Sequence, residues 1–258
     1  MDELHWIGFG TFFVVSLVTG VRLLLLARRT GEMPELLIGL AVLGIGPLGF
    51  GLSMLAFAAA GWSTITSATL QGSAFVAIFI GSTAQCLFIW YVFRRQAAWA
   101  RPLVYTAIAL LAAAYAADIL ENGLVNRSYE SSWYRASMAL RLLVMVWNSV
   151  ESLLYWSRMR RRLRLGLADP VVTNRFLLWG VSSAAAFFGS ALIFVVATLT
   201  GVDPNQIPSL TLTASLHGLV AAIAMWFAFQ PPAFYRRFIE SRARPDADAA
   251  PSPPEKPS

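Results

Sequence analysis

Four polar side chains interrupt the apolar segment 134–157 at helical spacing. They are separated by seven, three and four residues, so they share one face of a helix. The four are Arg141, Asn148, Glu151 and Tyr155, with Ser152 as the alternative to Glu151 on the same face. A charged group at the centre of a bilayer costs roughly 2.5–3.5 kcal/mol on insertion scales, so this face is expected to point into protein or a wet cavity. A guanidinium, a carboxamide and a carboxyl group on one buried stripe are suited to binding a polar ligand or holding a proton.

Glu151 occupies the most costly position on this stripe, because a leucine at the same place would insert without penalty. We expect Asn148 and Glu151 to point into the bundle, with Glu151 hydrogen-bonded to a neighbouring helix. Gln85 approaches the same depth from segment 70–93, and Arg22 is a second candidate partner. Glu151 is therefore predicted to contribute to function more than to packing.

A second polar group lies near the far end of segment 102–124. Asp118 and Glu121 are three residues apart there, in the sequence AADILENGL. Arg141 enters segment 134–157 from the same end, about two helical turns down. The sequence therefore predicts an ion pair between Arg141 and one of the two carboxylates.

A histidine completes the predicted site. His217 follows Thr213 by four residues on one face of segment 209–230. The predicted ligand-binding residues are Gln85, Asp118, Glu121, Arg141, Asn148, Glu151, Tyr155 and His217. Structural roles stay open beside these: His217 fits a hydrogen-bonded core histidine, and an Asp118–Arg141 pair could stabilise the bundle without touching a ligand.

The composition places these residues in a membrane protein. Hydrophobic residues make up 57% of the chain and charged residues 13%, with a mean hydropathy of +0.60. Soluble domains carry about 25% charged residues, so most of this chain is not adapted to water. The formal net charge of +6 resides in short arginine clusters between apolar runs, which argues for membrane orientation and against a nucleic-acid partner.

Seven apolar stretches have the length of a membrane-spanning helix, which is roughly 20 residues. They cover residues 5–27, 36–60, 70–93, 102–124, 134–157, 176–200 and 209–230. The predicted fold is all-α: a bundle of seven transmembrane helices over residues 1–240. Residues 241–258 are rich in Pro, Ala and charge, and are predicted to form a disordered cytoplasmic tail.

Arginines are concentrated in alternate connections. ARRTGEMPE, FRRQAAWAR, RMRRRLRLGLADPVVTNR and YRRFIESRAR are rich in arginine, whereas GWSTITSATLQG and GVDPNQIPS have none. The positive-inside rule makes the first group cytoplasmic, which predicts the N-terminus outside and the C-terminus inside. Only Arg127 and Arg135 argue the other way. The basic loops are also a predicted binding surface for a cytoplasmic protein partner.

Two further patterns concern the arrangement of the helices. WYVFRRQAAWAR and WFAFQPPAFYRR align Trp, Phe, Ala and Arg, which fits a three-plus-one-plus-three duplication. Interfacial aromatics followed by arginines explain the same likeness without a duplication. Pro47 lies among Gly44, Gly46, Gly49 and Gly51 in the second stretch, and a kink is expected there because proline removes a helix hydrogen bond.

Several cofactor-dependent classes are excluded by residue types. A covalent retinal pigment needs a lysine in a membrane helix, and the only lysine is Lys256 in the tail. The zinc sites of seven-helix membrane hydrolases need several histidines, and this chain has His5 and His217 alone. We therefore expect no metal and no cofactor. An intramembrane enzyme is the least favoured class, since no recognisable nucleophile and base occur together.

Residues 227–240, FAFQPPAFYRRFIE, resemble the exit from the last membrane helix in bacterial seven-helix sensor proteins. In those proteins a kinase or cyclase domain follows, and none is expected in this chain. The resemblance implies a sensor or receptor-like protein surrounded by membrane lipids. The polar residues predict that such a protein binds a small or lipidic ligand among the last four spans. A transporter or channel with a polar path along segment 134–157 is the alternative. The preference for Arg over Lys and the many alanines suggest a bacterial inner membrane.

Overall fold

A computed structural model describes residues 2–58, 61, 63–124, 130–202 and 204–243, with the side chains of residues 2–6, 57, 58, 205 and 243 excepted. Most of the predicted tail, residues 244–258, lies outside the described residues, as does Arg127. Over the described residues the chain is helical. The elements are α1 (Asp2–Thr30), α2 (Met33–Ile45), η1 (Gly46–Gly51), α3 (Leu52–Ala58), α4 (Thr64–Phe93), α5 (Ala100–Asn122), α6 (Ser132–Arg164), α7 (Pro170–Thr200), η3 (Pro204–Gln206), α8 (Pro208–Phe229) and α9 (Ala233–Ala243).

Seven stretches are long and apolar enough to cross a membrane, and they coincide with the seven predicted spans. They are Ile7–Thr30, Met33–Ala56, Thr64–Phe93, Ala100–Asn122, Ser132–Arg164, Pro170–Thr200 and Pro208–Phe229. Large apolar side chains such as Leu143, Leu199 and Val220 are exposed on the outer faces of these helices, where lipid would cover them. The prediction of an all-α, multi-pass membrane protein is confirmed at this level.

The helix ends follow from local sequence. Ser63, Ser131 and Asp169 precede α4, α6 and α7, and each side chain accepts a hydrogen bond from a backbone N–H in the first turn. α7 ends at Gly201, whose φ of 67° is a left-handed conformation that glycine adopts without strain. Polar and small residues between the apolar runs thus set where each span begins and ends.

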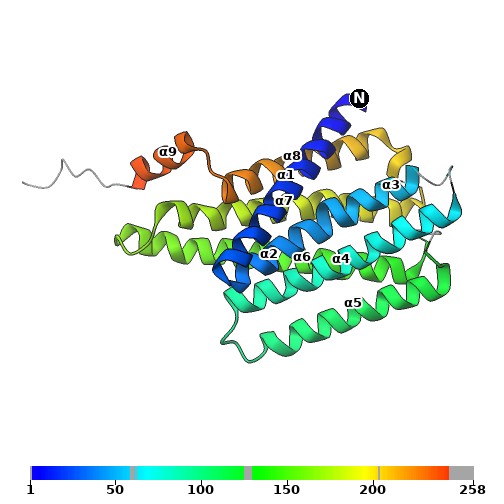
Figure 1. Ribbon diagram of the computed structural model, residues 1–258, viewed down its shortest axis with the longest axis horizontal. Coiled ribbons are helices and arrows are strands. Elements are labelled where there is room, and N and C mark those ends of the chain that lie inside the picture. The colour runs from blue at the N-terminus through cyan, green and yellow to red at the C-terminus, as the bar shows by residue number, and fades with distance from the viewer. Residues whose placement is uncertain (1, 59–60, 62, 125–129, 203, 244–258) are drawn as a thin grey trace, which may run out of the picture.

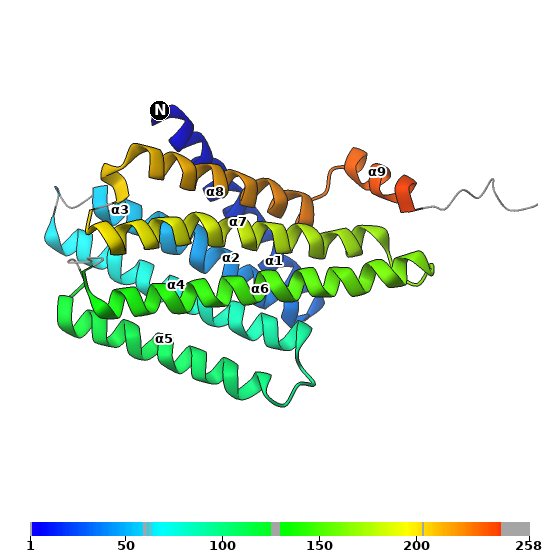
Figure 2. The same cartoon turned by 180° about the vertical axis from the view of Figure 1, so that it is seen from behind.

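The long helices lie side by side and alternate in direction, so the arginine-rich connections gather at one end of the bundle (Figure 1). We call this the basic end; it comprises residues 28–32, 94–99 and 158–169 together with α9. α6 and α7 project beyond the other helices there, as Figure 2 also shows. α7 packs between α6 and α8, α1 contacts α2 and α8, and α5 lies at the edge against α4 and α6.

The second span is not a regular α-helix. Between α2 and α3 the backbone is π-helical over η1, in which Gly46, Pro47, Gly49 and Gly51 are buried. Proline has no N–H for the α-helical ladder, which favours such an interruption. This is the place where a kink at Pro47 was expected from the sequence.

α2 and α4 cross in backbone contact. A Cβ placed on Gly44 would lie 2.5 Å from the carbonyl oxygen of Ala77, and one on Gly81 would lie 2.8 Å from the nitrogen of Ile45. Neither position has room for a side chain. The two glycines therefore set the distance between the helices, as small residues do in membrane bundles. Orientation in the membrane and the three-plus-one-plus-three repeat stay predictions.

Candidate functional site

α6 lies against α4, α5 and α7, so its polar stripe meets three neighbours. Asn148 is fully buried, and its Nδ2 donates to the hydroxyl of Ser183 on α7 at 2.7 Å. The indole N–H of Trp179 donates to Oδ1 of Asn148 at 3.3 Å. One turn along, the Ser149 hydroxyl donates to the carbonyl of Gly180 at 3.0 Å. Asn148 thus points inward as expected, and its polar groups are used to join α6 to α7.

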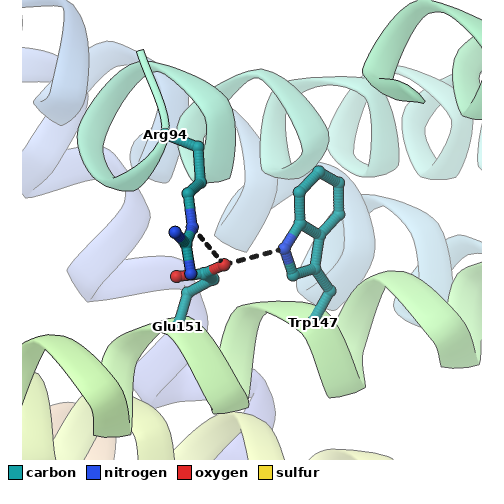
Figure 3. Close-up of polar contacts among 3 residues, drawn as sticks. All are labelled: Arg94, Trp147 and Glu151. Carbon is teal, nitrogen blue, oxygen red and sulfur yellow. Dashed lines mark hydrogen bonds and ion pairs between the residues drawn. The ribbon is translucent and has the colours of Figure 1, made fainter. Parts of the chain in front are cut away.

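Glu151 is 5% exposed and also points inward. Its Oε1 accepts hydrogen bonds from Nε of Arg94 at 2.7 Å and from the indole N–H of Trp147 at 3.2 Å (Figure 3). Arg94 directly follows the last residue of α4, so the bond joins two helices. The expected bond to a neighbouring helix is confirmed, whereas both partners named from the sequence, Gln85 and Arg22, were wrong.

Two tryptophans surround this ion pair. The guanidinium of Arg94 lies 5.7 Å from the ring centroid of Trp99, and the rings of Trp99 and Trp147 lie 6.3 Å apart. An aromatic face attracts a cation, so Trp99 adds to the contacts that hold Arg94 beside Glu151. Glu151 is consequently a compensated carboxylate at the basic end of the membrane span.

At the opposite end, Asp118 is 1% exposed and belongs to a different cluster. It accepts hydrogen bonds from the Ser131 hydroxyl at 2.8 Å and from Nδ2 of Asn122 at 3.0 Å. Ser131 also caps α6, so this cluster joins the end of α5 to the start of α6. The predicted pair with Arg141 was wrong, because Ser131 and Asn122 take the carboxylate and Glu121 is exposed.

Arg141 lies half-buried between the two ends. One terminal nitrogen of its guanidinium contacts the sulfur of Met138 at 3.3 Å, and its Nε has no hydrogen-bond partner among the described residues. Tyr155 stacks in an aromatic cluster, with ring centroids 4.5 Å from Phe176 and 5.6 Å from Phe93. Neither residue contributes to a shared pocket with Asp118.

A cavity of about 70 Å³ lies where α1, α2, α4, α6, α7 and α8 meet. Gln85 lines it, is 8% exposed, and its carboxamide makes no hydrogen bond to any described residue. Three hydroxyls, those of Ser16, Ser182 and Ser183, complete the polar lining. The apolar lining includes Phe12, Val42, Met145, Trp179 and Met225. No charged side chain lines this cavity.

The serine hydroxyls use only part of their hydrogen-bonding capacity within the protein. Ser16 donates to the carbonyl of Phe12 at 2.6 Å and Ser182 to the carbonyl of Ala221 at 2.8 Å. Each of these hydroxyls keeps its acceptor lone pairs, while Ser183, which accepts from Asn148, keeps its donor. Together with the carboxamide of Gln85, they offer a neutral guest both donors and acceptors.

The predicted residues are therefore dispersed over the bundle. Gln85 lines the cavity and Asn148 borders it through Ser183. His217 does not reach it: its Nδ1 lies 2.8 Å from the carbonyl of Thr213 in its own helix. Span 102–124, which was expected to help form the pocket, contributes no lining residue, whereas α1 and α2 contribute several.

Sequence reasoning missed Arg94, Trp147 and Trp179, whereas the small residues Ser182 and Ser183 were expected to allow tight packing or pocket volume. Trp147 precedes Glu151 by four residues, which is one helical turn, so helical spacing alone could have identified it. Arg94 was assigned to membrane orientation with the other arginines. The residues of α7 carry no signal beyond a run of small side chains, typical of close helix packing.

The described residues contain no group of three or more His, Cys, Asp or Glu side chains that could hold a metal ion. Comparisons with protein-family models, with curated proteins and with solved structures found no match. The cavity and the polar contacts around it are therefore the basis for a functional proposal.

Proposed function

We propose that this chain is an integral membrane receptor-like protein, of the bacterial inner membrane, that binds a small neutral ligand in the central cavity. The carboxamide of Gln85 carries this proposal. A buried polar group without a partner costs about 1–3 kcal/mol, and more where water is absent. The Gln85 carboxamide borders a cavity among six converging helices and has no hydrogen bond to a described residue, so a guest that hydrogen-bonds to it would supply the missing partner.

The lining defines the class of ligand. A charged guest would lack a counter-ion, because the cavity has hydroxyls, one carboxamide and apolar side chains around it. An apolar cavity of about 150 Å³ holds a benzene ring. A volume of about 70 Å³ therefore suits a molecule of a few heavy atoms, or a small group of waters that such a molecule displaces.

The contacts of α6 supply a route from the cavity to the basic end. A guest that binds the Ser183 hydroxyl would compete with, or strengthen, its bond to Asn148. Glu151 follows Asn148 by three residues on the same helix and holds Arg94 at the start of the α4–α5 connection. A small shift of α6 would thus reach a basic loop, which is the readout expected of a receptor.

A transporter is the second candidate, and η1 is the observation that favours it. Gly46 at the start of this π-helical segment lines the cavity, and π-helical turns are frequent at functional sites. A transport path along α6 is less favoured, because Asn148, Ser149 and Glu151 form hydrogen bonds between helices and do not line a path.

Access to the cavity distinguishes the two functions. We would place a cysteine at the cavity-lining Ala186 in a Cys86→Ala background and apply a small charged methanethiosulfonate reagent to vesicles of each orientation. A receptor predicts modification from one side of the membrane only, because the pocket opens to one compartment. Liquid chromatography with mass spectrometry of the intact protein would measure the modified fraction.

A matched control is Val181→Cys, on the outer face of the same helix. A thiol in lipid does not ionise and should not react. Modification of the Ala186→Cys protein from both sides would favour a transport path and contradict the receptor. Absence of reaction from either side, and equally with the small neutral reagent methyl methanethiosulfonate, would contradict a ligand-accessible cavity.

A further inference from the structure

A second hollow lies on the outside of the bundle, away from the central cavity. It has a volume of about 330 Å³ and is bounded by α7, α8 and α9. Its lining is apolar and includes Leu178, Val220, Ile223, Phe227 and Phe234. We call it the α8 groove. Because it opens on the surface that faces the bilayer, lipid chains are the molecules that reach it.

α9 borders the groove at the basic end and is attached there by specific contacts (Figure 1). The hydroxyl of Tyr235 accepts a hydrogen bond from Nδ2 of Asn174 on α7 at 2.8 Å. The rings of Tyr235 and Phe227 lie 4.6 Å apart. These contacts hold α9 against the end of the groove, so the groove is formed by specific packing of the three helices.

α9 has the pattern of a helix that lies in the membrane interface. Phe234 and Phe238, one turn apart, are 68% and 50% exposed. Arg237 is exposed on one flank of this apolar face, Arg236 is exposed on the opposite side of the helix, and Arg242 stacks on Phe238 at 4.5 Å. An exposed aromatic face flanked by arginines binds at the level of lipid headgroups and favours anionic ones.

A further arginine lies at the same end of the groove. Arg175 precedes Leu178 by three residues on α7, so the two share a face. Its Nε donates to the carbonyl of Ala228 at 3.2 Å, next to the groove residue Phe227. A guanidinium has five N–H donors, so Arg175 keeps donors for a phosphate.

We propose that the α8 groove binds one anionic glycerophospholipid from the leaflet at the basic end. One acyl chain lies along Phe227, Ile223 and Val220, and the phosphate pairs with Arg175 and with the arginines of α9. Phe227 and Val220 are seven residues apart, which is about 10 Å along a helix, against about 15 Å for half a hydrocarbon core. The groove thus matches most of the depth of one leaflet.

Charge decides between this occupant and others. A zwitterionic phospholipid would fill the apolar groove equally well and would also bring a phosphate, but its ammonium group would offset that charge beside the guanidinium groups of Arg236 and Arg237. A second copy of the chain would bring more arginines to the same place, because its own basic end has the same sign. An anionic phospholipid fills the groove with its acyl chain and pairs with the arginines through its headgroup.

The test is lipid binding to the delipidated full-length protein, measured by native mass spectrometry with phosphatidylglycerol and phosphatidylcholine of identical acyl chains. The parent is expected to bind phosphatidylglycerol on the order of tenfold more tightly, given about 1 kcal/mol for each arginine near the headgroup. Arg236→Gln with Arg237→Gln should remove this preference. The matched control, Arg161→Gln with Arg162→Gln at the exposed end of α6, removes the same charge and should retain it.

A second variant tests the groove itself. Val220→Trp places a large side chain where the acyl chain is expected and should weaken both lipids several-fold without changing any charge. Leu216→Trp, one turn earlier on α8 and equally exposed at 49%, is the control and should bind like the parent.

Two results would overturn the proposal: equal affinity of the parent for the two lipids, or equal binding by the Val220→Trp and Leu216→Trp proteins. A dimer that dissociates only in the Val220→Trp protein would identify a second copy as the occupant and would likewise reject the lipid. These outcomes are independent of the central cavity, which lies among different residues.

Discussion

At the residue scale, Glu151 is the side chain whose burial depends most on interactions with its neighbours. One of its oxygens accepts from both Arg94 and Trp147, and the ring of Trp99 lies beside the guanidinium of Arg94. A buried carboxylate is tolerated when a cation and hydrogen bonds compensate for its lost hydration. The free-energy cost of placing Glu151 in the membrane, which the sequence predicts, is thus offset by Arg94 at the end of α4.

Glu151→Leu is expected to destabilise the protein by roughly 2–3 kcal/mol, because Arg94 would keep its charge without a partner. This is less than for a fully buried ion pair, because the Arg94 side chain is 27% exposed and water can solvate it. Glu151→Gln keeps an acceptor oxygen and should cost about half as much. Thermal unfolding in detergent measures both. The double variant Arg94→Leu with Glu151→Leu should be less destabilised than the sum of the two single changes.

Glu121→Gln is the matched control, since Glu121 is exposed and should tolerate the change. If the Glu151→Leu and Glu151→Gln proteins both unfold at the parent temperature, the ion pair does not stabilise this fold. Loss of response to ligand in a stable Glu151→Gln protein would instead assign the charge to signalling.

At the scale of the elements, the crossing of α2 and α4 depends on backbone contact. Gly44 and Gly81 face each other there, beside the π-helical η1 and the wall of the central cavity. Helix association in a membrane draws on van der Waals packing rather than on the hydrophobic effect, so a lost contact is not replaced by another apolar one. The shape of the cavity follows from this crossing.

Gly81→Ala is expected to destabilise the protein by about 1–3 kcal/mol, because the new methyl group would overlap the backbone of Gly44 and Ile45. Gly10→Ala in α1 is the control: a Cβ there meets nothing within 4 Å, and alanine is the better helix former. Unfolding temperatures in the same detergent compare the two. A Gly81→Ala protein as stable as the Gly10→Ala protein would show that the helices separate without cost.

At the scale of the whole molecule, the described arginine-rich connections share one end of the bundle with α9, and the start of α1 lies at the other (Figures 1 and 2). The positive-inside rule applies to exactly such an asymmetry of loops. The expected orientation places the basic end in the cytoplasm, together with the proposed lipid site and the loop held by Arg94.

Ser63→Cys, in a Cys86→Ala background, tests this orientation. Ser63 is exposed before α4, at the end opposite the basic one, so an impermeant maleimide should label it from outside intact cells. Thr30→Cys, exposed at the basic end, is the control and should be labelled only after the membrane is permeabilised. Labelling of the Ser63→Cys protein from the cytoplasmic side would reverse the topology and move the proposed lipid site to the other leaflet.

The sequence by itself determined the number, type and approximate limits of the spans. Hydropathy and length are properties of a local stretch of sequence. A single segment buried in lipid can satisfy all of its backbone hydrogen bonds only as a helix. The inward direction of Asn148 and Glu151 was equally predictable, because helical spacing places them on one face and the cost of a charge in lipid selects the face.

Only the tertiary structure decided which residues meet. Arg94 rather than Gln85 or Arg22 pairs with Glu151, Ser131 rather than Arg141 binds Asp118, and α1 and α2 rather than α5 line the cavity. These outcomes depend on the order, tilt and separation of helices that are equally apolar on their outer faces. Such lateral arrangement arises from the fit of small and large side chains between helices, and the periodicity of one helix contains no information about its neighbour.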